Sequence, residues 1–203
     1  MARQAIEAEI LRIEDSDEQF LAQLDPNTYI AWYLPLRKLV SAAAVKVKYK
    51  PELIPEIIKA MSQVDYSEER LYASGLLKDL LDYQFQLIQN KAFSALEKQK
   101  WAPFAIDAIV NQLSGHEDKL NTVTYYLFRM LEQSGQTTSA AYLSLRILND
   151  ASCSISEDLS FQLESYRKMA VGSQAHDIPF SQARFAPSGN GAKSLKDLDA
   201  TFK

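Results

Sequence analysis

The sequence predicts an all-α protein with seven to nine helices, arranged as a compact bundle or as an irregular stack of helical hairpins. Two observations predict this class. Apolar residues recur at spacings of three and four along most of the chain, as they do on one face of a helix. Gly115, Gly135 and Gly172 each follow such a segment, where glycine commonly ends a helix. This agreement favours one helical domain over residues 1–172.

Several start signals are found near the N-terminus. Ile6, Ile10 and Ile13 predict a first helix, and Ser16 with Gln19 matches a capping box that would begin a second one.

Further start signals follow along the first quarter of the chain. Asp25 before Pro26 indicates a new helix start, and Pro35 is expected to kink or restart that helix. Residues 45–50 alternate apolar and basic side chains, which is a strand period. We interpret them as an extended connector or a frayed helix end.

The longest apolar pattern runs from Ser67 to Leu96, about 45 Å as one helix. It is expected to be either the spine of the fold or broken near Asn90. Gly75 falls inside this pattern, and we place it within the helix, packed closely against a neighbour. Helix starts are expected near residues 51, 67, 103, 117, 138 and 156, at intervals that fit no regular repeat.

Residues 173–193 have no helical period, and residues 173–203 are predicted to form a C-terminal arm that is extended over its first part. Within the arm, residues 194–202 are expected to form a short helix only when docked, because so few residues rarely hold a helix alone in water. The arm also carries apolar side chains that suit a groove on its own domain or on a partner. These candidate protein-binding residues are Ile178, Pro179, Phe180, Phe185, Leu195, Leu198 and Phe202.

Charge is unevenly distributed, although the net charge of the chain is only −4. Residues 1–25 carry two basic and seven acidic residues, and residues 26–50 carry five basic and no acidic residues, which gives local net charges of −5 and +5. The simplest structure places an acidic first helix beside a basic one. Basic and aromatic residues together are also typical of nucleic-acid-binding segments. The candidate contacts to a phosphate backbone are Arg37, Lys38, Lys46, Lys48 and Lys50.

The sequence lacks the patterns of common catalytic and metal sites, so we expect no enzyme activity, no cofactor and no metal. One cysteine and two histidines leave few residues for such chemistry. His116 is not followed by the second histidine of a zinc-protease motif, and residues 187–194 lack the contiguous Gly-Lys-Ser of a phosphate-binding loop. Cys153 stands near a predicted helix start but is not expected to be catalytic.

No segment reaches about 18 consecutive apolar residues, and the N-terminus lacks the apolar run of a secretory signal. We therefore expect a cytoplasmic protein without a membrane span. Our hypothesis is a non-enzymatic interaction or assembly subunit that uses helix faces and the C-terminal arm. Its partner would be another protein or a second copy of itself, as an adaptor, a scaffold or a self-assembling structural protein. The alternative is a nucleic-acid-binding or packaging protein that uses residues 29–50.

Overall fold

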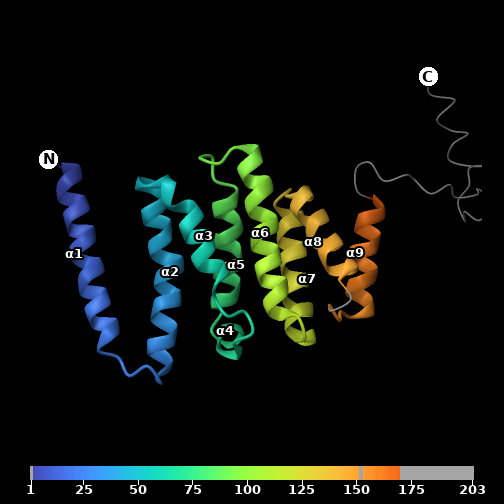
Figure 1. The fold of residues 1–203 in the computed structure, drawn as a ribbon, viewed down its shortest axis with the longest axis horizontal. Helices are drawn as coiled ribbons and strands as arrows, with labels where there is room; N and C mark the ends of the chain where they lie inside the picture. Colours follow the sequence, from blue (N-terminus) through green and yellow to red (C-terminus); the bar gives the residue numbers. More distant parts are fainter. Residues whose placement is uncertain (1, 151–152, 170–203) are drawn as a thin grey trace, which may run out of the picture.

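The computed structural model describes residues 2–150 and 153–169. These two ranges contain nine α-helices, one 3-10 helix and no strand. The all-α prediction is therefore confirmed. Figure 1 shows the helices standing side by side in roughly chain order, with α1 at one end and α9 at the other. The predicted arm lies outside the described residues.

Each new helix packs mainly on those that immediately precede it in the chain. Helices α5 and α6 pack on α3, α8 packs on α6 and α7, and α9 packs on α8. The helices are α1 Ala2–Ala22, α2 Tyr29–Tyr49, η1 Pro51–Leu53, α3 Ile54–Ser62, α4 Glu69–Ala73, α5 Leu76–Ile88, α6 Ala95–Leu113, α7 Glu117–Gln133, α8 Thr137–Asn149 and α9 Glu157–Met169.

A continuous band of buried apolar side chains runs through the stack, from Val47 in α2 to Leu163 in α9. Ile58 in α3, Phe85 in α5 and Ile106 in α6 are fully buried at its centre. The stack therefore has one core that extends along its length, because each helix buries one face against its neighbours.

Helix α1 is one uninterrupted helix, so the second start predicted at Ser16 is wrong. A Ser-x-x-Gln pattern also fits the exposed surface of a continuing helix, and Ser16 is exposed. The predicted start after Asp25 is wrong by three residues. Thr28 is the N-cap of α2, and its side-chain oxygen accepts a hydrogen bond from the N–H of Ala31 at 3.3 Å.

Helix α2 continues through Pro35 and through residues 45–49, so neither the predicted restart nor the predicted connector is present. Proline removes only one hydrogen bond of the helix, that to the carbonyl of Ala31, and the packed neighbours compensate for this loss. Ala43 and Val47 are both buried and lie four residues apart. That spacing places them on one helical face, so the helix period outweighs the local alternation.

The long pattern from Ser67 to Leu96 is divided between α4, α5 and the start of α6, and the break predicted near Asn90 is confirmed. Gly75 lies between α4 and α5 with φ of 76°, not inside a helix. A Cβ built there meets nothing within 4 Å, so the close packing predicted at Gly75 is wrong. Glycine is needed at this position because it adopts the left-handed backbone conformation without strain.

Helix α6 begins eight residues before Pro103, which is inside it rather than at its start. Ser94 and Glu97 form a capping box at the true start, and this box outweighs the proline as an initiation signal. Gly115 and Gly135 are confirmed at helix ends, with φ of 85° and 71°. Gly172 lies outside the described residues.

Candidate functional site

The acidic first helix lies beside the basic second helix, as the charge distribution predicts (Figure 1). Nζ of Lys38 in α2 lies 3.2 Å from Oδ2 of Asp17 in α1. Both side chains are partly exposed, so this ion pair contributes well under about 1 kcal/mol to stability. It shows which faces of the two helices meet.

The remaining candidate phosphate contacts are distributed around α2. Arg37 donates to Oδ2 of Asp79 in α5 at 2.9 Å. Lys48 and Lys50 are exposed, and the Lys48 ammonium lies 5.8 Å from the ring centre of Tyr49. At about 100° per residue, Arg37 and Lys48 share one side of the helix, whereas Lys46 lies on the opposite side. The structure thus places only two of these cations on one side.

The aromatic residues of the same stretch gather at the start of α2. The Tyr29 ring lies 5.5 Å from the Trp32 ring and 5.6 Å from the Tyr33 ring, measured between centres. The guanidinium of Arg70 lies 4.8 Å from the centre of Trp32. The exposed lysines are at the other end of α2, about 22–32 Å away at 1.5 Å per residue. The aromatic cluster at the start of α2 is therefore separated from the exposed lysines at its end, where Tyr49 is the neighbouring aromatic residue.

The α1–α2 hairpin leaves large apolar side chains exposed. Ile13 and Phe20 of α1 are 47% and 53% exposed, and Tyr29 and Ile30 of α2 are 51% and 47% exposed. A shallow groove of about 310 Å³ separates the helices, and Phe20, Leu21 and Leu34 form its apolar part. Helix α2 thus covers α1 only in part.

Sequence reasoning missed this face because it ended the first helix at Ser16. With α1 continuous, Ile13 and Phe20 are seven residues apart and lie on the same side. They extend the stripe begun by Ile6 and Ile10 in the sequence, at spacings of four, three and seven. This spacing is typical of helices that pair along their length.

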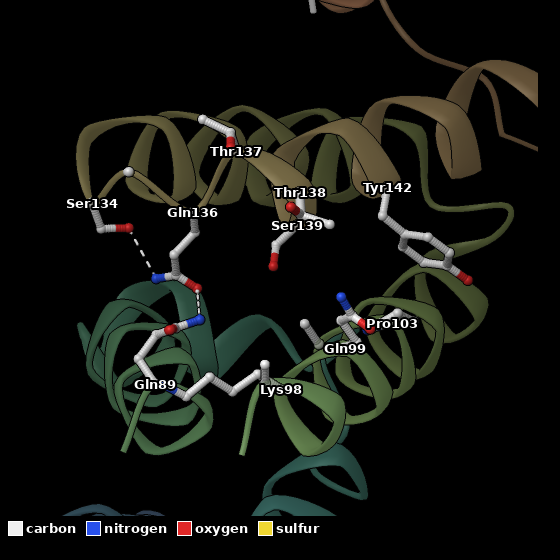
Figure 2. Close-up of a pocket in the computed structure, with 13 residues that line it drawn as sticks. Gln89, Lys98, Gln99, Pro103, Ser134, Gln136, Thr137, Thr138, Ser139 and Tyr142 are labelled. Carbon is white, nitrogen blue, oxygen red and sulfur yellow. Dashed lines mark hydrogen bonds between the residues drawn. The ribbon is translucent and has the colours of Figure 1, made fainter. Parts of the chain in front are cut away.

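A second feature, which the sequence did not indicate, is a cavity of about 480 Å³ between α6 and the beginning of α8 (Figure 2). It is lined mostly by polar residues and small residues. These are Gln89, Ala95, Lys98, Gln99, Ala102, Pro103, Ser134, Gly135, Gln136, Thr137, Thr138, Ser139 and Tyr142.

No protein-family model, curated protein or solved structure matches this chain. None of the helices in the two described ranges combines the length and the apolar composition needed to cross a membrane. The candidate arm residues, from Ile178 to Phe202, lie outside those ranges.

Proposed function

We propose that this chain is a non-enzymatic assembly subunit whose α1–α2 hairpin pairs with the same hairpin of a second copy. The observation that supports this most strongly is the half-exposed apolar stripe of α1, marked by Ile13 and Phe20. Tyr29 and Ile30 add exposed apolar surface on the same hairpin, and we call these four side chains the apolar patch. Burying a large apolar side chain contributes about 1.5–3 kcal/mol, so such a patch favours a partner.

Two hairpins that meet through this patch form a four-helix bundle. The apolar spacing along α1 is the one used in such bundles, where side chains of one helix fit between those of the next. In a two-fold pairing each residue meets its counterpart in a reciprocal way, so a single patch serves both copies. The location of the hairpin at one end of the stack leaves room for the second copy (Figure 1).

The charges of the hairpin support the same pairing. The N-terminal 25 residues carry a net −5 and the next 25 carry a net +5. A two-fold arrangement that places α1 of one copy against α2 of the other brings opposite charges together twice. Such complementarity selects orientation and partner more than it adds affinity.

The C-terminal arm belongs to this proposal as a second contact. Its apolar residues, Phe180 and Phe185 among them, suit a groove on a neighbouring subunit. The cytoplasmic location expected from the sequence is also part of the proposal.

The test is the mass of the full-length protein in solution, measured by sedimentation equilibrium. We expect the wild type to dimerise. Phe20→Glu is expected to raise the dissociation constant at least about 100-fold, because two buried rings are lost in each dimer. The matched control is Phe161→Glu on α9, at the other end of the stack, where the ring is 72% exposed. This control should dimerise like the wild type.

Two results would contradict the proposal. The first is a wild type that stays monomeric at high micromolar concentration. The second is a Phe20→Glu variant that dimerises like the Phe161→Glu control. Circular dichroism on each variant separates loss of pairing from loss of folding, because a folded monomer keeps its helical signal.

A further inference from the structure

The cavity between α6 and α8 lies far along the stack from the α1–α2 hairpin, so it raises a separate question (Figure 1). One wall is the first turn of α8. The opposite wall is formed by Lys98, Gln99 and Pro103 of α6, and Gln89 at the end of α5 closes one side (Figure 2). At about 480 Å³, the cavity has the size of a small-molecule site.

The first turn of α8 lines the cavity, and its backbone N–H groups are available as hydrogen-bond donors. No side chain of the described residues caps this helix, and its first turn contains no acidic residue. The first N–H groups of a helix have no partner inside it and carry the positive end of the helix dipole. In α8 these groups belong to Thr137, Thr138 and Ser139, which all line the cavity.

Ser139 gives independent evidence for a ligand. The residue is only 8% exposed, yet within the described part of the chain its hydroxyl has no hydrogen-bond partner. Figure 2 shows the Ser139 oxygen directed into the cavity. No buried side-chain oxygen or nitrogen of the described residues lacks a partner, so the Ser139 oxygen itself is open to the cavity. A bound group there can pair with it.

The charge around the cavity favours an anion. Lys98 is half-buried, and its ammonium forms no ion pair with any described residue. The lining includes no aspartate or glutamate among the described residues. Asp107, beyond the rim, is already engaged. It accepts from the Tyr142 hydroxyl at 2.9 Å and from Nε of Arg146 at 3.1 Å.

We propose that this cavity binds a phosphate group. Residues with three kinds of donor line this cavity: the first N–H groups of α8, the Ser139 hydroxyl and the Lys98 ammonium. This combination matches the oxygens of a phosphate better than a single carboxylate, which has fewer acceptor sites. Pro103 cannot donate to the Gln99 carbonyl, so that oxygen can accept from a hydroxyl of the ligand.

Free phosphate and a small phosphate ester share this chemistry, and titration of the full-length protein distinguishes them. The probes are inorganic phosphate and glycerol 3-phosphate, followed by backbone amide NMR shifts, with acetate and sodium chloride at equal ionic strength for comparison. We expect saturable shifts of Thr137, Thr138 and Ser139 with both phosphates. Tighter binding of the ester identifies a phosphorylated small molecule, and equal affinity identifies free phosphate. Either result supports the site.

Two substitutions locate the binding. Ser139→Ala is expected to weaken phosphate binding about twofold to tenfold, as for one neutral hydrogen bond. Lys98→Gln should weaken it about tenfold or more, because its bond to the anion is charged. The matched control is Lys78→Gln, an exposed lysine on the adjacent helix α5 that does not line the cavity, and it should bind like the wild type.

The proposal is overturned if neither phosphate shifts these amides, or if acetate or chloride shifts them equally. It is also overturned if Ser139→Ala and Lys98→Gln bind phosphate as the Lys78→Gln control does. None of these outcomes bears on pairing through the α1–α2 hairpin, so the two proposals are tested separately.

Discussion

The hydroxyl of Tyr66 donates a hydrogen bond to Oε1 of Gln84 across 3.2 Å, and both side chains are completely buried. The Gln84 amide in turn donates to Oγ of Ser62 at 2.8 Å. The side chain of Gln112 binds the backbone of the same two residues, Ser62 and Tyr66. Its amide donates to the Ser62 carbonyl at 2.9 Å, and its oxygen accepts from the Tyr66 N–H at 3.1 Å. A polar network thus connects α3, α5 and α6 within the apolar core.

Replacing Gln84 by methionine is expected to lower the free energy of unfolding by about 1–3 kcal/mol, because it leaves the Tyr66 hydroxyl buried without an acceptor. Adding Tyr66→Phe should restore part of that loss. Urea denaturation of the two single variants and the double variant measures this coupling. Strictly additive losses would show that the hydrogen bond contributes nothing.

Alkaline pH is expected to destabilise the fold through Tyr72. Burial, with a smaller contribution from the charge of Asp65, raises the pKa of Tyr72 to about 12. An unfolded tyrosine has a pKa of about 10. The folded state therefore keeps the full stabilisation from the protonated Tyr72 hydroxyl below about pH 10. This stabilisation is lost as the pH rises towards 12.

The measurement is the free energy of unfolding between pH 8 and pH 12, compared with that of the Tyr72→Phe variant. The variant should lose less stability over this interval than the wild type does. If stability falls with pH in parallel for the two proteins, Tyr72 does not have this role. Tyr66, whose pKa is also raised by burial, contributes equally to the pH dependence of the wild type and the variant.

Gly75 is expected to resist replacement by alanine. With φ of 76°, a residue with a Cβ is strained there by about 1–2 kcal/mol, although nothing lies within 4 Å of the added atom. Gly75→Asn should cost less, because asparagine tolerates the left-handed region better. Thermal or urea unfolding compares the two, and equal losses would point to a cause other than the backbone conformation.

The arm is predicted to strengthen assembly. In the full-length chain, Phe180→Ala combined with Phe185→Ala should increase the dissociation constant of the oligomer, because two apolar contacts per subunit are lost. Sedimentation equilibrium measures this change against Phe161→Ala, which removes an exposed ring on α9. An unchanged dissociation constant would show that the two phenylalanines of the arm do not contribute to the interface.

Nucleic-acid binding by residues 29–50 is the competing prediction. Arg37 and Lys38 already pair with acidic side chains, so the exposed Lys48 and Lys50 would carry the phosphate contacts. Two such contacts predict that the logarithm of the association constant falls with the logarithm of salt concentration with a slope of about −1.5 to −2. Fluorescence anisotropy with a labelled oligonucleotide measures this slope. Absence of binding at about 50 mM salt would exclude the idea.

Local patterns predict much of the fold because most helices bury one face against a neighbour. They fail where two signals compete for the same boundary. Ser16 and Pro103 both resemble helix starts, but these local signals do not record whether the preceding turn is already helical. Sequence reasoning misses the exposed stripe on α1 for the same reason, because a helix start at Ser16 places Phe20 on a different helix from Ile13.

The cavity could not be found from the sequence. Its walls come from α6 and α8, and Gln99 and Ser139 are forty residues apart with no motif connecting them. Only the packing of α8 on α6 brings them to opposite sides of one space. A serine at the third position of a helix is unremarkable until its surroundings are known.

The order of the helices along the stack also bears on how quickly the chain folds. Because each helix rests mainly on those just before it, few contacts require distant segments to meet, and the entropic cost of closing long loops is small. Small helical domains with such local contacts fold on timescales of microseconds to milliseconds. During synthesis, each hairpin can settle onto a surface that is already in place, which shortens the time for which apolar faces such as that of α3 stay uncovered.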